Sequence, residues 1–167
     1  MNILKRTVLI IDGNSDMRAV VGNILFKEYN VVTKKDELEA FAWLQKGNLP
    51  SSIILGLESE IDPKKSFLIN LQSTGFYSEL PIIVLSACEK ESFRADLTKL
   101  GAFAILGKPF DPSVLKSNIA ATMPALQEII PVNKNIRKST PELIYNLVPN
   151  FREAVTGAML LFINQYF

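Results

Sequence analysis

The sequence predicts an α/β protein in which a five-stranded parallel sheet is covered by helices on both faces. Five short runs of aliphatic and β-branched residues alternate with five segments that show helical periodicity. The runs are apolar at consecutive positions, which is typical of strands buried on both faces and joined by helical crossovers. With 48% hydrophobic residues the chain can also bury a large core. We therefore expect a three-layer, doubly wound domain.

The predicted strands are bounded by polar or glycine-containing breaks. They occupy residues 7–11, 29–33, 52–55, 81–87 and 102–106. The first strand, TVLII, runs into the polar segment DGNSD. The fourth begins at Pro81, a position that a strand tolerates because its first residue need not donate to the ladder.

The predicted helices follow from apolar residues that recur three and four positions apart. The first carries Met17, Val20, Val21, Ile24 and Leu25. Asp36 followed by Glu39 indicates a capping box for the second helix, which Gly47 ends. The third ends near Gly75, the fourth covers about 91–100, and the fifth follows GKPFD through Val114, Leu115 and Ile119.

The C-terminal part of the chain differs from the αβ repeat. We expect a first domain over 1–125, a linker over 126–141 that contains the polar and basic PVNKNIRKSTP, and a helical extension over 142–167. The last predicted helix is too apolar to stand alone in water, so we expect it to pack on the first domain or on another chain. The pattern breaks off inside this helix, which leaves open that the chain is a fragment of a longer protein.

Charge and composition exclude several classes of function. With 18 basic and 17 acidic residues, the net charge of +1 gives no reason to expect nucleic acid or anionic lipid as a partner. The longest apolar run, GAMLLFI at 157–163, is too short for a membrane span. A single cysteine allows no internal disulfide, which fits the cytoplasm. The absence of histidine excludes histidine nucleophiles, histidine bases and histidine-ligated metals.

Ligands of open parallel sheets bind at the carboxyl ends of the strands, so the residues there are the candidate site. These residues are Asp12, Gly56, Ser86 and Lys108. Gly56 is unusual, because a glycine in a strand loses packing and backbone entropy.

The motifs VLIID, PIIVLSA and GAFAILGKPF, which carry Asp12, Ser86 and Lys108, resemble the receiver domain of two-component response regulators. The resemblance extends from about residue 5 to 125 and implies a flavodoxin-like fold. In that family two acids after the first strand and an aspartate after the third bind Mg²⁺. The third-strand aspartate accepts a phosphoryl group from a kinase phosphohistidine, and a Ser or Thr and a Lys bind its oxygens. The bond between this Lys and the following proline is often cis.

This chain matches the receiver pattern only in part. Asp12, Ser86 and Lys108 match, whereas Gly13 replaces the second acid and Gly56 the phosphoacceptor. Aspartyl phosphorylation needs a carboxylate nucleophile, and Mg²⁺ is usually held through carboxylates. We therefore expect no metal or other cofactor, with Mg²⁺ binding weak or absent.

Three further positions bear on this expectation. Ile105 stands where the resemblance implies a switch aromatic, and a branched aliphatic cannot rotate between buried and exposed positions in the same way. Glu58 and Asp62 follow Gly56 and leave open a substitute acceptor or ligand. The resemblance implies a pseudo-receiver: a non-enzymatic, bacterial, cytoplasmic protein that acts by phosphorylation-independent protein–protein interaction.

The retained charges need partners. We expect Asp12 and Lys108 to pair directly, since either charge alone in a partly buried cleft is costly. Simpler roles stay open: Asp12 as the cap of the first helix, and Ser86 as a backbone cap after the fourth strand.

The expected partners are other signalling proteins, such as a histidine kinase or a regulator. A homodimer is an alternative, formed through the face of the fourth helix, fifth strand and fifth helix, or through the C-terminal helix. We expect no nucleic acid and no membrane partner.

Other functions fit the sequence less well. Asp12, Ser86 and Lys108 also resemble a haloacid-dehalogenase-like phosphatase with Asp12 as nucleophile, but Asn14 stands where that family needs an acid. A DNA-associated regulator truncated after its receiver is suggested by the basic segment NKNIRK, 133–138, which is more simply a solvated linker. The first strand also lacks the Gly-x-Gly-x-x-Gly turn of dinucleotide enzymes.

Overall fold

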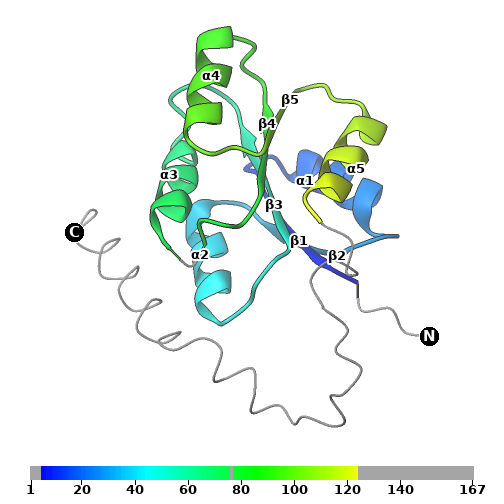
Figure 1. Ribbon diagram of the computed structural model, residues 1–167. Helices are drawn as coiled ribbons and strands as arrows, with labels where there is room; N and C mark the ends of the chain where they lie inside the picture. Colours follow the sequence, from blue (N-terminus) through cyan, green and yellow to red (C-terminus); the bar gives the residue numbers. More distant parts are fainter. Residues whose placement is uncertain (1–4, 76, 124–167) are drawn as a thin grey trace, which may run out of the picture. The chain divides into compact units, whose positions relative to one another are not determined.

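A five-stranded parallel sheet with the strand order β2-β1-β3-β4-β5 forms the centre of the first domain (Figure 1). The computed structural model describes residues 5–75 and 77–123. The strands are β1 (Thr7–Ile11), β2 (Asn30–Lys34), β3 (Ser52–Leu57), β4 (Ile82–Ser86) and β5 (Ala104–Gly107). The predicted fold class is thus confirmed for the first domain. The predicted linker, 126–141, and helical extension, 142–167, lie outside the described residues.

Helices cover both faces of the sheet, as the alternating pattern predicts (Figure 1). They are α1 (Ser15–Leu25), α2 (Glu37–Gln45), α3 (Lys65–Ser73), α4 (Glu91–Lys99) and α5 (Pro112–Ala121). Residues of α1 and α5 form one buried cluster with the sheet, and residues of α2, α3 and α4 form the other. In the described residues, no helix combines the length and apolarity that crossing a membrane would require.

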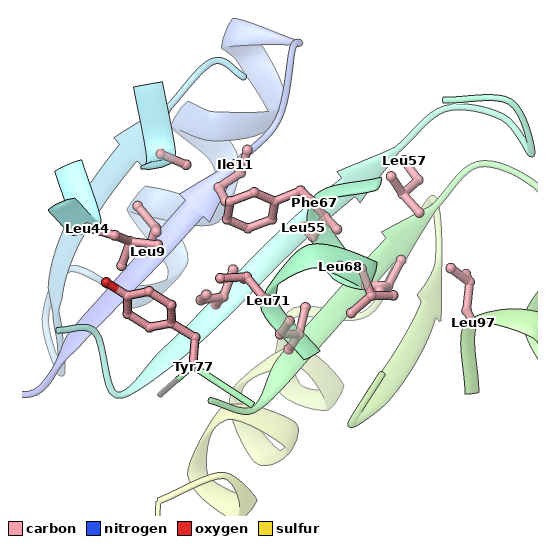
Figure 2. Packing of buried hydrophobic residues seen from close by; sticks show 14 of the residues in the cluster. Leu9, Ile11, Leu44, Leu55, Leu57, Phe67, Leu68, Leu71, Tyr77 and Leu97 are labelled. Atoms are coloured by element: carbon pink, nitrogen blue, oxygen red, sulfur yellow. The ribbon is translucent and has the colours of Figure 1, made fainter. Parts of the chain in front are cut away.

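The larger core lies between the sheet and the helices α2, α3 and α4. Phe67, Leu68 and Leu71 of α3 are fully buried there against Leu9 of β1 and Leu55 of β3 (Figure 2). Burying a side chain of this size stabilises a fold by roughly 1.5–3 kcal/mol. This core holds β1 and β3 side by side, which positions the residues at their carboxyl ends.

Helix termini follow the local sequence signals. The Asp36 carboxylate accepts a hydrogen bond from the backbone N–H of Glu39, and Gly47 ends that segment with a φ of 83°, as predicted. The alternative left open for Asp12, as the cap of the first helix, is wrong, because Asn14 is the N-cap of α1 and accepts from the N–H groups of Asp16 and Met17.

Strand β3 extends further than the sequence indicates. The prediction ends it at Leu55, but the ladder with β4 continues and pairs Gly56 with Leu85 and Leu57 with Ser86. Gly56 therefore lies inside the sheet, between the neighbouring strands β1 and β4, and not in a loop after it.

Candidate functional site

The parallel sheet brings the carboxyl ends of β1, β3, β4 and β5 to one edge, where the predicted site residues meet. Asp12 follows β1, Gly56 lies near the end of β3, Ser86 ends β4 and Lys108 follows β5. The structure brings Asp12, Gly56 and Lys108 together at this edge, whereas the Ser86 hydroxyl bonds within its own loop.

Asp12 is buried, and both of its carboxylate oxygens are bonded. Its side chain is 2% exposed, Oδ1 accepts the backbone N–H of Asn14 at 2.8 Å, and Oδ2 accepts from Lys108 Nζ at 2.9 Å. The predicted ion pair between Asp12 and Lys108 is therefore present. Because the pair is buried, each charge depends on the other: removing one partner leaves an uncompensated buried charge.

Gly56 gives room to the Asp12 carboxylate. A Cβ atom built on Gly56 would lie 1.8 Å from Asp12 Oδ2 and 2.4 Å from Asp12 Cγ, far inside van der Waals contact. The carboxylate thus occupies the space that any side chain at position 56 would enter. Position 56 requires glycine because the Asp12 carboxylate lies so close to it, and not because of its backbone angles.

Gly13, the other position where the resemblance implies an acid, is exposed and surrounded by open space. A Cβ atom added there would meet nothing within 4 Å. The two glycines therefore differ physically, because only Gly56 is sterically constrained.

Lys108 has a second carboxylate partner that the sequence analysis missed. Its side chain is 9% exposed, and Nζ donates to Glu58 Oε1 at 2.6 Å as well as to Asp12. Burial acts to lower the pKa of Lys108, but hydrogen bonds to Glu58 and Asp12 outweigh it and raise the pKa above its usual value. The ammonium is held charged between two carboxylates. The position of Glu58, two residues after Gly56, was the only signal in the sequence.

Ser86 is buried at the end of β4, and its hydroxyl bonds to the backbone of its own loop. Oγ accepts the N–H of Cys88 at 3.0 Å and lies 3.2 Å from the carbonyl oxygen of Cys88, to which it donates. This is the backbone-capping role that the sequence left open for Ser86.

Asp62 is also buried, but it pairs within its own loop. Both oxygens lie 2.8 Å from Lys64 Nζ, and they also accept the N–H groups of Glu58 and Lys64. Burial acts to raise the pKa of Asp62, but the Lys64 ammonium and the two amide donors together lower it below its usual value.

Two features of β5 and the following loop complete the site. The Lys108–Pro109 peptide bond is cis, as the resemblance implies. Ile105 is half-buried, packs against the larger core and accepts a hydrogen bond on its carbonyl oxygen from Arg94 Nη2 at 2.9 Å.

The residues at this edge do not fit Mg²⁺. Of the three carboxylates implied by the resemblance only Asp12 is present, and both its oxygens are bonded to the Asn14 amide and to Lys108. Within residues 5–75 and 77–123, no group of three or more Cys, Asp or Glu side chains is arranged to hold a metal ion. Mg²⁺ demands oxygen ligands in near-octahedral geometry, which this donor set does not supply.

Comparison with known proteins identifies the family of this fold. The sequence profile of the response regulator receiver domain family matches residues 8–120. The chain belongs to this family. It is therefore a receiver domain of the kind that operates in two-component signalling, and receiver domains are in general non-enzymatic signalling modules. None of the curated proteins compared with the chain shows significant sequence similarity to it.

Solved receiver structures share the fold. The chemotaxis response regulator CheY4 of Vibrio cholerae is 25% identical, with a TM-score of 0.63, over 71% of this chain and 99% of that one. A response regulator from Burkholderia multivorans is 27% identical, with a TM-score of 0.59, over 72% of this chain and 98% of that one. The receiver domain of a histidine kinase from Syntrophus aciditrophicus, at 20% identity and a TM-score of 0.62 over 81% of this chain and 97% of that one, supports the fold alone.

Proposed function

We propose that this receiver domain is a pseudo-receiver, which binds other signalling proteins without being phosphorylated. One observation carries the proposal: the Asp12 carboxylate lies in the space that a phosphoacceptor side chain at position 56 would fill. Gly56 offers no nucleophile, and Asp12 is buried with both oxygens bonded. The same burial weighs against a phosphatase that uses Asp12 as its nucleophile, since an attacking oxygen must reach the substrate.

The two other acids near Gly56 are also engaged. Glu58 is bonded to Lys108, and Asp62 accepts four hydrogen bonds from its own loop. We therefore infer that neither substitutes as phosphoacceptor and that Mg²⁺ binds weakly or not at all. Without differential ligand binding there is no free energy to shift the domain between two states. The domain then presents one fixed conformation.

The partner site that we propose lies on the face of α4, β5 and α5, within its α4–β5 part. A hollow of about 260 Å³ lies there, lined by Arg94, Ala95 and Thr98 of α4 together with Phe103 and Ile105 among others. Phe103 is 49% exposed on this surface, which gives a partner an aromatic anchor. A histidine kinase, another regulator or a second copy of the chain are the partners proposed for it. The alternative dimer site, the C-terminal helix, lies outside the described residues and stays a prediction.

Incubation with acetyl phosphate, or with beryllofluoride and Mg²⁺, tests the proposal. We expect unchanged Trp43 fluorescence, an unchanged oligomeric state by size-exclusion chromatography, and no mass increase of a phosphoryl group. A receiver domain with all three carboxylates serves as the positive control. A saturable response, or an acyl phosphate that hydroxylamine removes, would falsify the pseudo-receiver.

A second experiment tests the surface. Phe103→Ala should weaken self-association or kinase binding, and a phosphodonor should change neither interaction. Ile69→Ala, which truncates another exposed apolar side chain on α3, is the matched control. Equal effects of the two variants would count against the α4–β5 surface.

A further inference from the structure

The loop between β3 and α3 contains three acids spaced two residues apart, each paired with a different lysine. Glu58 binds Lys108 at 2.6 Å, Glu60 binds Lys90 at 2.6 Å, and Asp62 binds Lys64 at 2.8 Å. We call residues 58–64 the acidic loop. Its lysine partners come from three places in the fold: the segment after β5, the residue before α4, and the acidic loop itself.

The innermost pair gives the acidic loop its shape. Asp62 and Lys64 are almost fully buried, with side chains 5% and 11% exposed. Asp62 Oδ2 also accepts the backbone N–H of Glu58 at 2.9 Å, so the carboxylate fixes the backbone from which the Glu58 side chain extends. Loss of the Lys64 contact would leave an unpaired buried charge, which favours a single conformation of this loop.

The two outer pairs connect the acidic loop to its neighbours in the sheet. Glu58 reaches Lys108 beyond β5, and Glu60 reaches Lys90, the N-cap residue of α4. The side chain of Lys90 makes no capping hydrogen bond and instead contacts Glu60, which connects the start of α4 to the acidic loop. This hydrogen bond also lowers the pKa of Glu60 and raises that of Lys90.

A third contact connects α4 to β5 at the proposed partner surface. Arg94, one turn into α4, donates to the carbonyl oxygen of Ile105 in β5. Charged hydrogen bonds therefore join the acidic loop to the start of α4 and to the segment after β5, and join α4 to β5.

We propose that the acidic loop is an electrostatic clamp that fixes the start of α4 and the segment after β5 in one conformation. Glu58 and Glu60 act as positioning residues, and Asp62 positions the backbone that carries Glu58. The clamp is internal to the chain and needs no bound ligand. Its use in presenting the α4–β5 surface to a partner rests on the function proposed above, whereas the clamp itself does not.

Hydrogen exchange of the full-length chain tests the clamp. In Glu58→Gln/Glu60→Gln, amide exchange at Cys88–Arg94 and at Lys108 should become about two- to five-fold faster, because surface ion pairs contribute only modestly to local stability. In the unchanged protein, about 1 M NaCl, where the Debye length is about 3 Å, should accelerate the same amides, and in the double variant it should add little. Glu28→Gln, which removes the exposed pair with Lys116, is the matched control and should leave these amides unchanged.

A charge exchange separates pairing from the mere loss of a side chain. Lys90→Glu places two acids together and should accelerate exchange at the start of α4. Adding Glu60→Lys restores an opposite-charge pair and should return the rates to those of the unchanged protein. Unchanged rates in the double glutamine variant, an equal effect of Glu28→Gln, or failure of the charge exchange to restore protection would each overturn the clamp. None of these outcomes depends on phosphorylation, so these experiments test the clamp independently of the pseudo-receiver proposal.

Discussion

Replacing Gly56 with alanine adds one methyl group at the point where the Asp12 carboxylate lies. The new Cβ would be 1.8 Å from Oδ2, so the carboxylate must move by more than 1 Å to reach ordinary contact. Such a movement breaks the 2.9 Å bond to Lys108. Losing one partner of a buried pair costs about 3–5 kcal/mol. Because Glu58 still holds Lys108, we expect Gly56→Ala to lower the free energy of unfolding by about 2–4 kcal/mol.

Urea unfolding followed by Trp43 fluorescence measures this loss. Gly13→Ala is the matched control, because its Cβ meets nothing within 4 Å, and it should change stability by less than about 0.5 kcal/mol. Asp12→Gly removes the obstructing carboxylate, so Gly56→Ala should cost little in that background. If the effects of Asp12→Gly and Gly56→Ala instead add within about 0.5 kcal/mol, the two sites do not compete for space and the reasoning is refuted.

Two further predictions follow from the same contacts. Asp62→Asn should cost about 1–3 kcal/mol at neutral pH, whereas Asp96→Asn on the exposed face of α4 should cost little. Because the folded pKa of Asp62 lies below its unfolded value of about 3.9, its stabilisation is present above that pH and is lost as pH falls through the folded pKa. The stability difference from Asp62→Asn should therefore shrink in acid, and a difference independent of pH would contradict the assignment. Acids at positions 13 and 56 should restore Mg²⁺ affinity only when Asp12 moves out of the space beside position 56. We therefore expect Gly13→Asp/Gly56→Asp to bind Mg²⁺, measured by calorimetry, and to be less stable than the unchanged protein, measured by urea unfolding.

The helices and strands were predictable because their signals are local. Capping by Asp36 and the glycine that ends α2 each depend on a few neighbouring residues, and both are present as expected. The end of β3 was placed two residues early, because its last two positions are held by pairing with β4, about 29 residues away in sequence.

Part of the site was predictable as well. Asp12 and Lys108 were expected to meet, because the carboxyl ends of parallel strands share one edge of the sheet. Glu58 was considered as a phosphoacceptor or metal ligand and not as the second partner of Lys108, since its side-chain direction depends on the backbone that Asp62 holds.

The sequence by itself determined the layered αβ architecture, the four strand-end positions of the site, and the lack of an acidic side chain at two of the places where receivers carry one. The first two follow from residue identity and short-range periodicity, and the third from the resemblance to receiver domains. Only the tertiary structure decided that Asp12 takes up the space beside Gly56, and that the three acids of the acidic loop each pair with a different lysine. The reason is that side-chain rotamers in a packed interior are chosen by neighbours that are distant in sequence, 96 residues in the case of Asp12 and Lys108.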